Sequence, residues 1–494
     1  MTLVRTFKAA LAGVAATPRQ LLIDGCWSDA ADGGTMPTIN PATGLPLAEV
    51  ACGGAADIDL AVTAARRAFE GPWSATTPYD RQRILLRLAD LIEANYDTIA
   101  LLDSLDMGVP ITRARAGRHS APQLLRYYAG VIPTLRGETI SPSVPGAPFV
   151  ATLREPVGVV GAITPWNAPF RMCVWKAGPA LAAGCTIILK PAEQSPLSAL
   201  YFGQLCLEAG VPPGVVNVVP GMAEAGKRLA EHPGVDKISF TGSTGTGQHI
   251  IRASAVNVKR LSLELGGKSA HIILNDADLD LAAPAAAQAV FQNSGQICSA
   301  GTRLFVEDAI HDEFVERVLA ETAALRMGDP LDPETQLGPL VDQAQKATVQ
   351  RYISVGLSEG ARLLAGGADV QEKALAAGSF VPPTVFAGVR DDMTIAREEI
   401  FGPVLSILRF SDRDEVIRRA NASEYGLGAG LWTRDVGAAH GLGRRLRAGT
   451  VWVNCYQMMD PAVPFGGYRL SGYGRESGYG HVHEFLETKA LWIR

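Results

Sequence analysis

One cysteine in the segment QNSGQICSAGTR, residues 292–303, has neighbours that are too small to pack it into a core. Gly295 stands three residues before Cys298, and the Ser-Ala-Gly run at 299–301 follows it. A thiolate is a strong nucleophile, and small neighbours leave room for a substrate carbonyl. The segment favours a presented nucleophile, although an ordinary buried cysteine would explain it as well.

An acid ends the apolar stretch LSLELGGK. Burial there would raise the pKa of Glu264 towards neutrality, which suits a general base. The alternative is a carboxylate paired with Lys268, which is near in the sequence.

An asparagine follows a predicted buried strand in TPWNAPF. The primary amide of Asn167 could donate a hydrogen bond to a developing oxyanion, an interaction worth about 3 kcal/mol. The alternative is turn chemistry, because asparagine before Ala-Pro is a common turn residue.

Three further turns suit a dinucleotide. In LKPAEQSP, Lys190 and Glu193 follow a strand, where an acid can bind a ribose diol and repel a 2′-phosphate. The loop FTGSTGTG, 240–247, offers backbone N–H groups to a pyrophosphate, although its G-x-x-G-x-G spacing differs from the usual G-x-G-x-x-G. The turn EEIFGPV, 398–404, could bind a second ribose while Phe401 packs on an apolar ring, or it is a hairpin turn with solvated acids.

Short buried strands that alternate with Ala-rich helices must position these turns. Strands are predicted at 157–163, 186–190, 215–219, 237–240 and 260–265, and helices at 171–183, 197–209 and 222–231. This alternation predicts βαβ units and a parallel sheet, in which ligands bind at the carboxyl ends of the strands.

The flanking segments predict three more parts. A helical region covers about 57–130, and residues 136–153 suggest a hairpin. After Gly266 the α/β pattern restarts, with strands at 269–274 and 303–307, helices at 281–292 and 309–326, and further alternation to about 454. The final ALWIR predicts a strand that pairs with another element or another subunit.

Composition limits the class of protein. The 494 residues are 47% hydrophobic and 19% charged, which suits two to four globular domains. A net charge of -5 without blocks of like charge argues against nucleic acid and membrane partners. The seven scattered cysteines, without a CxxC pair, predict neither a disulfide framework nor a metal site, and they favour a cytoplasmic location.

The N-terminal stretch MTLVRTFKAALAGVAATPRQ allows two interpretations. Basic residues before an Ala-rich run resemble a weak signal or transit peptide. Because the apolar part is short and broken by Gly13, we favour a flexible tail over residues 1–20.

Taken together and in order, seven of these stretches resemble the aldehyde dehydrogenase superfamily. They are PWNAPF, LKPAEQSPLSAL, FTGST, LELGGK, GQICSAGTR, EEIFGPV and PFGGYRLSGYGRESG, and the resemblance runs from about LLIDGCWSDA to the C-terminus. It implies an α/β fold with a Rossmann-like cofactor domain, an α/β catalytic domain and a small β oligomerisation element. The implied ranges are 21–131 and 151–258 for NAD binding, 259–465 for catalysis, and 132–150 with 480–494 for assembly into a homodimer or homotetramer.

The resemblance also implies residue roles. In catalysis, Cys298 would be the nucleophile, Asn167 and the Cys298 N–H the oxyanion hole, and Glu264 the activator of water, with Lys176 and Glu476 at positions linked to proton transfer. Lys190 and Glu193 would bind the adenosine ribose, Ser243 the pyrophosphate and Glu399 the nicotinamide ribose. The whole set implied for NAD is Ile163, Thr164, Trp166, Lys190, Glu193, Gly242, Ser243, Leu265, Glu399 and Phe401.

The implied reaction oxidises an aldehyde to a carboxylic acid. Attack by Cys298 gives a thiohemiacetal, loss of hydride to NAD leaves a thioester, and water activated by Glu264 hydrolyses it. CoA-acylating relatives lack this glutamate, so its presence favours hydrolysis. Glu193 favours NAD over NADP.

The substrate tunnel implied by the resemblance involves residues near 119–124 and near 456–459. Its other members would be Phe170, Trp175, Phe291, Gln292, Ile297, Ser299 and Met459. This lining predicts a medium-to-large aromatic, terpenoid or hydroxylated aldehyde. No arginine stands out in the predicted tunnel, which argues against a carboxylated semialdehyde. In the alternative, Gln292 points away and the enzyme accepts a broad range of aliphatic aldehydes.

Two rival functions remain. A structural or binding protein would have no need of Cys298, Glu264 and Asn167, all of which the chain retains. A thiol esterase would need no dinucleotide, so Glu193, Ser243 and Glu399 argue against it.

Overall fold

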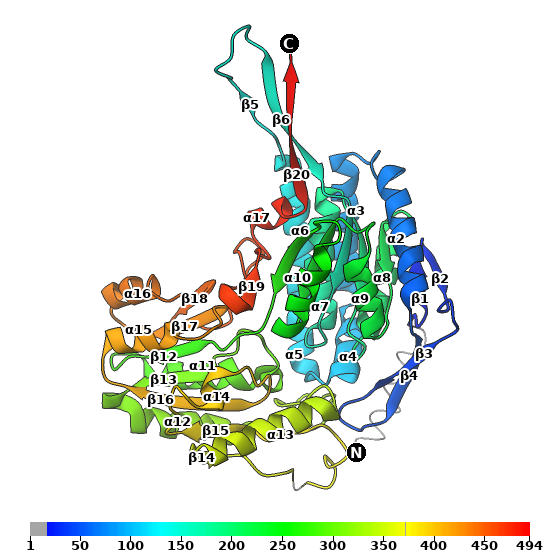
Figure 1. The fold of residues 1–494 in the computed structure, drawn as a ribbon. Coiled ribbons are helices and arrows are strands. Elements are labelled where there is room, and N and C mark those ends of the chain that lie inside the picture. Colours follow the sequence, from blue (N-terminus) through cyan, green and yellow to red (C-terminus); the bar gives the residue numbers. More distant parts are fainter. Residues whose placement is uncertain (1–16, 371) are drawn as a thin grey trace.

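The computed structural model describes residues 17–370 and 372–494 of the chain. Most of the predicted tail, residues 1–16, lies outside the described part. Two large sheets, each covered by helices, form the body, and a small sheet projects from it (Figure 1). The predicted α/β class is confirmed.

The first large sheet has eight strands in the order β19-β11-β10-β7-β8-β9-β1-β2. Its strands are β1 (Leu21–Ile23), β2 (Cys26–Ser28), β7 (Val159–Ile163), β8 (Thr186–Lys190), β9 (Val216–Val218), β10 (Lys237–Thr241), β11 (Arg260–Glu264) and β19 (Gly472–Tyr473). The five strands from β11 to β9 are parallel, as the alternating pattern predicts. Their carboxyl ends therefore share one edge of the sheet.

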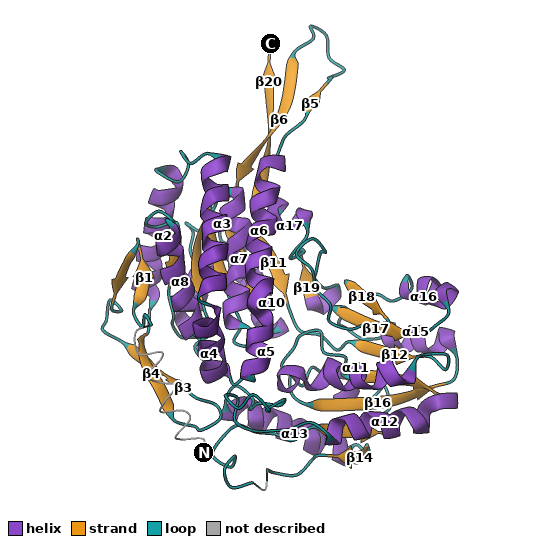
Figure 2. Cartoon of the chain, turned by 180° about the vertical axis from the view of Figure 1, so that it is seen from behind, coloured by secondary structure: helices purple, strands orange, loops and turns teal. Residues whose placement is uncertain are grey.

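Helices cover both faces of this sheet, and α3, α6, α7 and α8 form one packed layer (Figure 2). The helices are α2 (Ala55–Glu70), α3 (Pro78–Ala94), α4 (Tyr96–Met107), α5 (Ile111–Ala116), α6 (Ser120–Val131), α7 (Pro169–Ala183), α8 (Leu197–Ala209), α9 (Ala223–Glu231) and α10 (Thr244–Ser254). The helical region predicted at 57–130 is thus five helices. A capping box of Thr77 and Asp80 begins α3, and the chain turns at Asn95, where α3 gives way to α4.

The second large sheet has seven strands in the order β14-β15-β16-β13-β12-β17-β18. Its strands are β12 (Ala270–Ile273), β13 (Arg303–Glu307), β14 (Arg362–Ala365), β15 (Thr384–Ala387), β16 (Val404–Phe410), β17 (Gly428–Trp432) and β18 (Thr450–Val453). Its helices are α11 (Leu279–Phe291), α12 (His311–Ala323), α13 (Gln343–Ser358), α14 (Thr394–Arg397), α15 (Arg413–Asn421) and α16 (Val436–Gly443). Only β14 runs antiparallel to its neighbour within this sheet.

Two smaller sheets complete the described chain. Strand β6 (Phe149–Pro156) lies between β5 (Thr139–Ile140) and β20 (Leu486–Ile493), and this antiparallel sheet extends away from the body (Figure 1). The predicted hairpin and terminal strand are both confirmed. The short helix α17 (Tyr479–His483) leads into β20, and β3 (Thr35–Ile39) pairs with β4 (Pro46–Ala51).

Sheet membership differs from the predicted domain ranges in two places. Strand β11 pairs with β10, so the chain leaves the first sheet after Glu264 and not at residue 259. Strand β19 returns to that sheet after the predicted end of the catalytic range at 465. Hydrophobic alternation shows that a strand is buried but not which sheet it joins.

Candidate active site

A left-handed turn after α11 presents Cys298. Asn293, Ser294 and Gly295 have φ angles of 52°, 56° and 76°, so three successive residues adopt a conformation that ordinary side chains disfavour. A Cβ at Gly295 would overlap the Gly402 carbonyl. This close approach packs the acid-bearing turn at 398–404 against the Cys298 loop.

Two glycines of LELGGK bring a third segment to the same place. A Cβ at Gly266 would overlap the Glu399 carboxylate, and one at Gly267 would overlap the Cys298 carbonyl. The Gly267 N–H donates to Glu399 Oε1 at 2.9 Å. The paired glycines therefore let the chain beyond β11 pass directly beside both functional groups.

Asn167 contacts the Cys298 loop from the turn between β7 and α7. Its Nδ2 donates to the Gln296 carbonyl at 2.8 Å, and Asn293 Nδ2 donates to the Asn167 carbonyl at 3.0 Å. An amide carries two N–H donors. One holds the loop, and no other partner for Nδ2 occurs among the described residues.

Glu264 is a buried carboxylate at the end of β11. Neither oxygen has a hydrogen-bond partner in the described chain. Burial raises the pKa of Glu264 well above its usual range, and Glu476 raises it further. The alternative pairing with Lys268 is not found, since Lys268 Nζ also lacks a hydrogen-bond partner and burial lowers the pKa of that amine to about 7.

A buried ion pair lies beside this acid. Lys176 of α7 contacts Glu476, which follows β19, and both side chains are almost fully buried. Glu476 also exchanges two backbone hydrogen bonds with Phe465, each 2.7 Å long. Because Lys176 lowers the pKa of Glu264 while Glu476 raises it, the three groups form one electrostatic unit.

The surroundings of Cys298 favour the protonated thiol. Burial, together with the carboxylates of Glu399 and Glu264, raises the pKa of Cys298 to about 12. A proton must leave the sulfur when the reaction begins.

The residues expected to bind a dinucleotide gather at the carboxyl ends of β7, β8 and β10. Lys190 Nζ lies 3.3 Å from Glu193 Oε2 beyond β8. Ser243 Oγ accepts from the Thr246 N–H at 3.2 Å and begins α10, so Ser243 caps this helix. The first N–H groups of α10 have no partner within the helix, so an anion at that terminus could accept their hydrogen bonds.

The backbone connects the other members of this set. The Thr164 N–H donates to Lys190 at 3.1 Å, directly after β7 has ended at Ile163. The Gly242 N–H donates to the backbone carbonyl of Glu264 at 3.0 Å. Leu265, beyond β11, is bound through its N–H to the Ser471 carbonyl at 3.1 Å.

A second acid and two aromatic rings lie nearer Cys298. Burial raises the pKa of Glu399 to about 7, and only Oε1 has a hydrogen-bond donor among the described residues. The rings of Trp166 and Phe401 meet edge to face, with centroids 5.2 Å apart. An acid with a free oxygen beside aromatic surface fits a ribose and its attached apolar ring, so this donor set fits a dinucleotide.

Comparison with known proteins identifies the family of this chain. The model of the aldehyde dehydrogenase family matches residues 27–491. The chain belongs to this family. Aldehyde dehydrogenase family 2 member B4 of Arabidopsis thaliana is 49% identical over 96% of this chain and 87% of its own. The mitochondrial benzaldehyde dehydrogenase of Antirrhinum majus is 48% identical over 96% and 88%.

Solved structures agree with this aldehyde dehydrogenase fold. The NAD+ complex of aldehyde dehydrogenase from Bacillus cereus has 46% sequence identity and a TM-score of 0.95, and the match covers 98% of each chain. In the described part of the present chain, no helix is long and apolar enough to cross a membrane.

The predicted substrate residues fall into two groups in this aldehyde dehydrogenase. Phe170 and Phe291 are each only 1% exposed, and they pack in the cores beside the first and second sheets. Trp175, which is 4% exposed, belongs to the same core as Phe170, and Ser299 is also buried. Gln292, Ile297 and Met459 are more exposed.

An aromatic cluster backs the Cys298 loop. Tyr456 donates from its hydroxyl to the Ser299 carbonyl at 3.0 Å and packs with Trp452 at 5.0 Å between ring centroids. Cys298 packs against the same cluster. The segment 456–459 therefore reaches the nucleophile, as the resemblance implies.

The sequence interpretation missed one arginine. Arg171 lies 4.2 Å above the Trp175 ring and donates to the Met459 sulfur at 3.1 Å, so it contacts two predicted tunnel residues. The expectation of a tunnel without arginine did not consider Arg171. Spacing gave a usable signal, because residues four apart on a helix share a face and Arg171 is four residues before Trp175.

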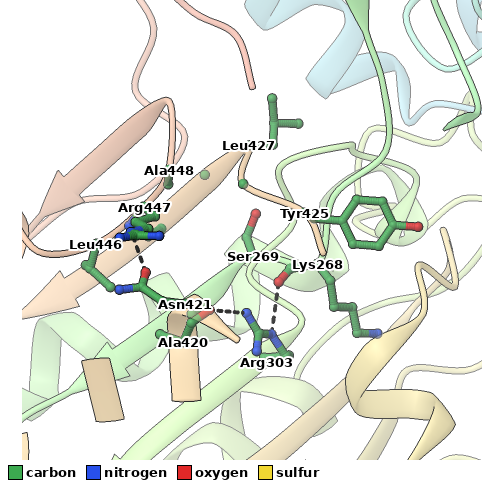
Figure 3. Close-up of a pocket in the computed structure, with 14 residues that line it drawn as sticks. Lys268, Ser269, Arg303, Ala420, Asn421, Tyr425, Leu427, Leu446, Arg447 and Ala448 are labelled. Carbon is green, nitrogen blue, oxygen red and sulfur yellow. Dashed lines mark hydrogen bonds between the residues drawn. The ribbon is translucent and has the colours of Figure 1, made fainter. Parts of the chain in front are cut away.

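A small cavity lies behind the strand that follows LELGGK (Figure 3). Arg303 donates to the Lys268 carbonyl at 2.9 Å and to the Ala420 carbonyl at 3.0 Å, while the Lys268 amine points away from Arg303 (Figure 3). The volume is about 20 Å³, enough for one water molecule. This cavity is too small for an aldehyde substrate. Its lining residue Arg303 instead holds the backbone at Lys268.

Proposed function

We propose that this enzyme oxidises a medium-to-large aldehyde to a carboxylic acid through a covalent intermediate on Cys298. NAD-dependent aldehyde oxidation is the reaction of its family, and NAD is the cofactor. The observation that carries the covalent mechanism is the convergence of Cys298, Asn167 and the unpaired buried carboxylate of Glu264. These are the nucleophile, oxyanion donor and base that acyl chemistry requires.

NAD, when bound, accepts the hydride that leaves the aldehyde carbon. Glu193 and Lys190 would hold the adenosine ribose, and the start of α10 with Ser243 the pyrophosphate. Glu399 and Phe401 would hold the nicotinamide half. A carboxylate at Glu193 repels a 2′-phosphate, so we propose NAD in preference to NADP.

In the first half-reaction, the Cys298 sulfur bonds to the aldehyde carbon and its proton passes to a base. The carbonyl oxygen becomes an oxyanion within reach of the free Asn167 N–H and the Cys298 N–H. Collapse of this thiohemiacetal, with loss of hydride, leaves a thioester on Cys298. Asn167 stabilises the charge as it develops.

In the second half-reaction, Glu264 removes a proton from water, which attacks the thioester carbon. The carbon–sulfur bond breaks, and the carboxylic acid leaves. A raised pKa makes Glu264 a stronger base than a surface carboxylate. The Lys176–Glu476 pair lies in electrostatic contact with Glu264 and would carry the proton away.

For the substrate, we propose an aromatic, terpenoid or hydroxylated aldehyde. The aromatic cluster of Trp452 and Tyr456 at Cys298 supports an apolar ring there. A benzaldehyde dehydrogenase among the relatives points the same way. The alternatives are a broad-range aliphatic enzyme and a protein retained for binding or structure.

The deciding experiment measures NADH formation across aromatic, terpenoid, hydroxylated and aliphatic aldehydes, with Cys298→Ala as the matched variant. We expect the wild-type enzyme to form NADH and the Cys298→Ala variant to form none. Equal rates for all short aliphatic aldehydes would favour the broad-range alternative. Binding of NAD without oxidation of any aldehyde would favour the non-enzymatic alternative.

We also propose assembly and location. The projecting sheet of β5, β6 and β20 supports its role in forming a homodimer or homotetramer. The seven cysteines are free, which supports a reducing compartment such as the cytoplasm.

A further inference from the structure

Arg171 is a cation without an anion. It begins the substrate-facing side of α7, and no carboxylate among the described residues lies within salt-bridge distance of it. Its only hydrogen-bond acceptor there is the Met459 thioether, which is a weak acceptor. The guanidinium carries five N–H donors, so most of them remain available to a ligand or to water.

A second arginine adds positive charge at the same place. Arg113 of α5 is half-buried and also has no salt bridge in the described chain. Burial lowers the pKa of Arg113 to about 10, and the nearby Arg171 charge contributes to that shift. Two like charges brought together without an anion repel each other, so the fold keeps this arrangement at an energetic cost.

Two surface acids have partners of their own. Asp460 follows Met459, but its carboxylate accepts from the Ala462 N–H at 2.8 Å. Asp97 pairs with Arg115 and Arg118 on the surface. No acid among the described residues forms a salt bridge with Arg171, although the charge of Glu476 partly offsets the lowering of its pKa by burial.

The position of Arg171 connects it to the reaction. It lies between Met459, which is 40% exposed, and Trp175, which is 4% exposed, so it stands where the predicted passage leads inwards. The Met459 segment continues from Tyr456, which binds the Cys298 loop at Ser299. These contacts place Arg171 against the segment that also holds the Cys298 loop.

We propose that the aldehyde substrate carries a carboxylate at its far end and that Arg171, supported by Arg113, binds this carboxylate. The inference rests on the proposed function and narrows its substrate class to aldehyde acids with an apolar middle. A planar guanidinium matches a carboxylate with two parallel hydrogen bonds, and the Trp175 ring holds the guanidinium in place. Such an acid must come from a reaction that leaves an aldehyde and a carboxylate on one molecule, such as oxidative ring cleavage or oxidative deamination of the terminal amine of an ω-amino acid.

The test compares an acid with its own neutral ester. We would measure kcat/KM for 4-formylbenzoate and its methyl ester, and for succinic semialdehyde and its methyl ester. The wild-type enzyme should prefer the acid of at least one pair by about tenfold or more, because charge-assisted hydrogen bonds are strong. Equal values for acid and ester in both pairs would overturn the inference while leaving aldehyde oxidation established.

Three variants locate the effect. In Arg171→Met, the acid-to-ester ratio should fall towards one. Arg171→Lys should retain part of the preference for the acid. Lysine keeps the positive charge but lacks the planar guanidinium that forms two parallel hydrogen bonds. Arg118→Gln is the matched control, since it removes a nearby arginine that already pairs with Asp97, and it should leave the ratio unchanged.

The outcomes are distinguishable. A preference that survives Arg171→Met in protein with an unchanged unfolding temperature would contradict the role of Arg171. If Arg171→Met does not fold, a ratio unchanged in Arg171→Lys would contradict it instead. If no aldehyde is oxidised by the wild-type enzyme, the proposed function fails, and this inference fails with it.

Discussion

Burial and nearby carboxylates disfavour the thiolate form of Cys298, which is the reactive form. Two acids and burial hold the proton on the sulfur, although the mechanism needs the thiolate. At about pH 8, a pKa of about 12 leaves on the order of one thiolate in ten thousand.

Alkylation by iodoacetamide should therefore be slow without ligands and should accelerate about tenfold per pH unit from about pH 7 to about pH 10. The variant Glu399→Gln removes a negative charge, lowers the thiol pKa and should speed alkylation at a given pH. Peptide mass spectrometry distinguishes Cys298 from exposed Cys26, and Cys298→Ala is the control. A rate independent of pH in this range would contradict the raised pKa.

Replacing Glu264 by Gln should separate the two half-reactions. Acylation should continue and deacylation should slow by about 100- to 10,000-fold, since a general base is lost. Rapid mixing should show one NADH per active site, and intact mass should show the acyl adduct. Ordinary steady-state turnover in this variant would remove Glu264 from the mechanism.

The pH profile of the wild-type enzyme tests the same residue by another route. The folded pKa of Glu264 is raised, so the base becomes protonated at a higher pH than an exposed glutamate would. Deacylation should fall as pH decreases through that raised pKa and should be full above it. A rate that stays level down to about pH 5 would be inconsistent with this carboxylate as the base.

The oxyanion role of Asn167 predicts a loss in kcat. Asn167→Ala should lower kcat by about 100- to 1000-fold, the usual cost of one oxyanion donor. Asn257→Ala is the control, because that amide binds the Pro233 and Val235 carbonyls away from the site. Similar kinetics for both variants would contradict the assignment.

At the scale of elements, the turn between α11 and Cys298 depends on one glycine. Gly295→Ala would put a methyl group into a left-handed conformation, at a cost of about 1–2 kcal/mol, and against the Gly402 carbonyl. The variant should unfold at a lower temperature and lose activity, because the turn at 398–404 must move.

The matched control is Gly441→Ala in α16, where nothing lies within 4 Å of the added carbon. Alanine is favoured over glycine within a helix by up to about 1 kcal/mol, so this variant should be neutral or slightly stabilised. Calorimetry would compare both proteins. Equal unfolding temperatures for the two variants would show that the Cys298 turn tolerates a side chain.

At the scale of the whole molecule, the projecting sheet exposes apolar side chains. Such exposed apolar groups are typical of an interaction surface. Phe149, Trp492 and Ile493 are each more than half exposed, and strand β20 follows β6 along its whole length. A sheet edge with apolar faces is a natural surface for association.

Trp492→Lys should therefore weaken association, and sedimentation should show a shift to lower mass at a given concentration. Val436→Lys is the control, since Val436 is also more than half exposed and lies on α16 in another part of the molecule. The control should leave the mass unchanged. If both variants keep the wild-type mass, the projecting sheet is not the main interface.

Local pattern predicts much of this protein. The strands β8 and β13 and the helix α8 lie where hydrophobic spacing places them, because each is a continuous apolar or helical run between turn residues. The motif residues also meet as the family resemblance implies, since parallel strands deliver their carboxyl ends to one edge. Such features depend on short segments, so they can be predicted without knowledge of the tertiary structure.

The features that tune the chemistry depend instead on contacts distant in the chain. Lys176 finds Glu476 across 300 residues, and Glu264 remains unpaired although Lys268 is close in sequence. Arg171 of α7 contacts Met459 although 288 residues separate them in the chain. Burial and charge proximity set pKa values and ligand preference, and both are properties of packing in three dimensions.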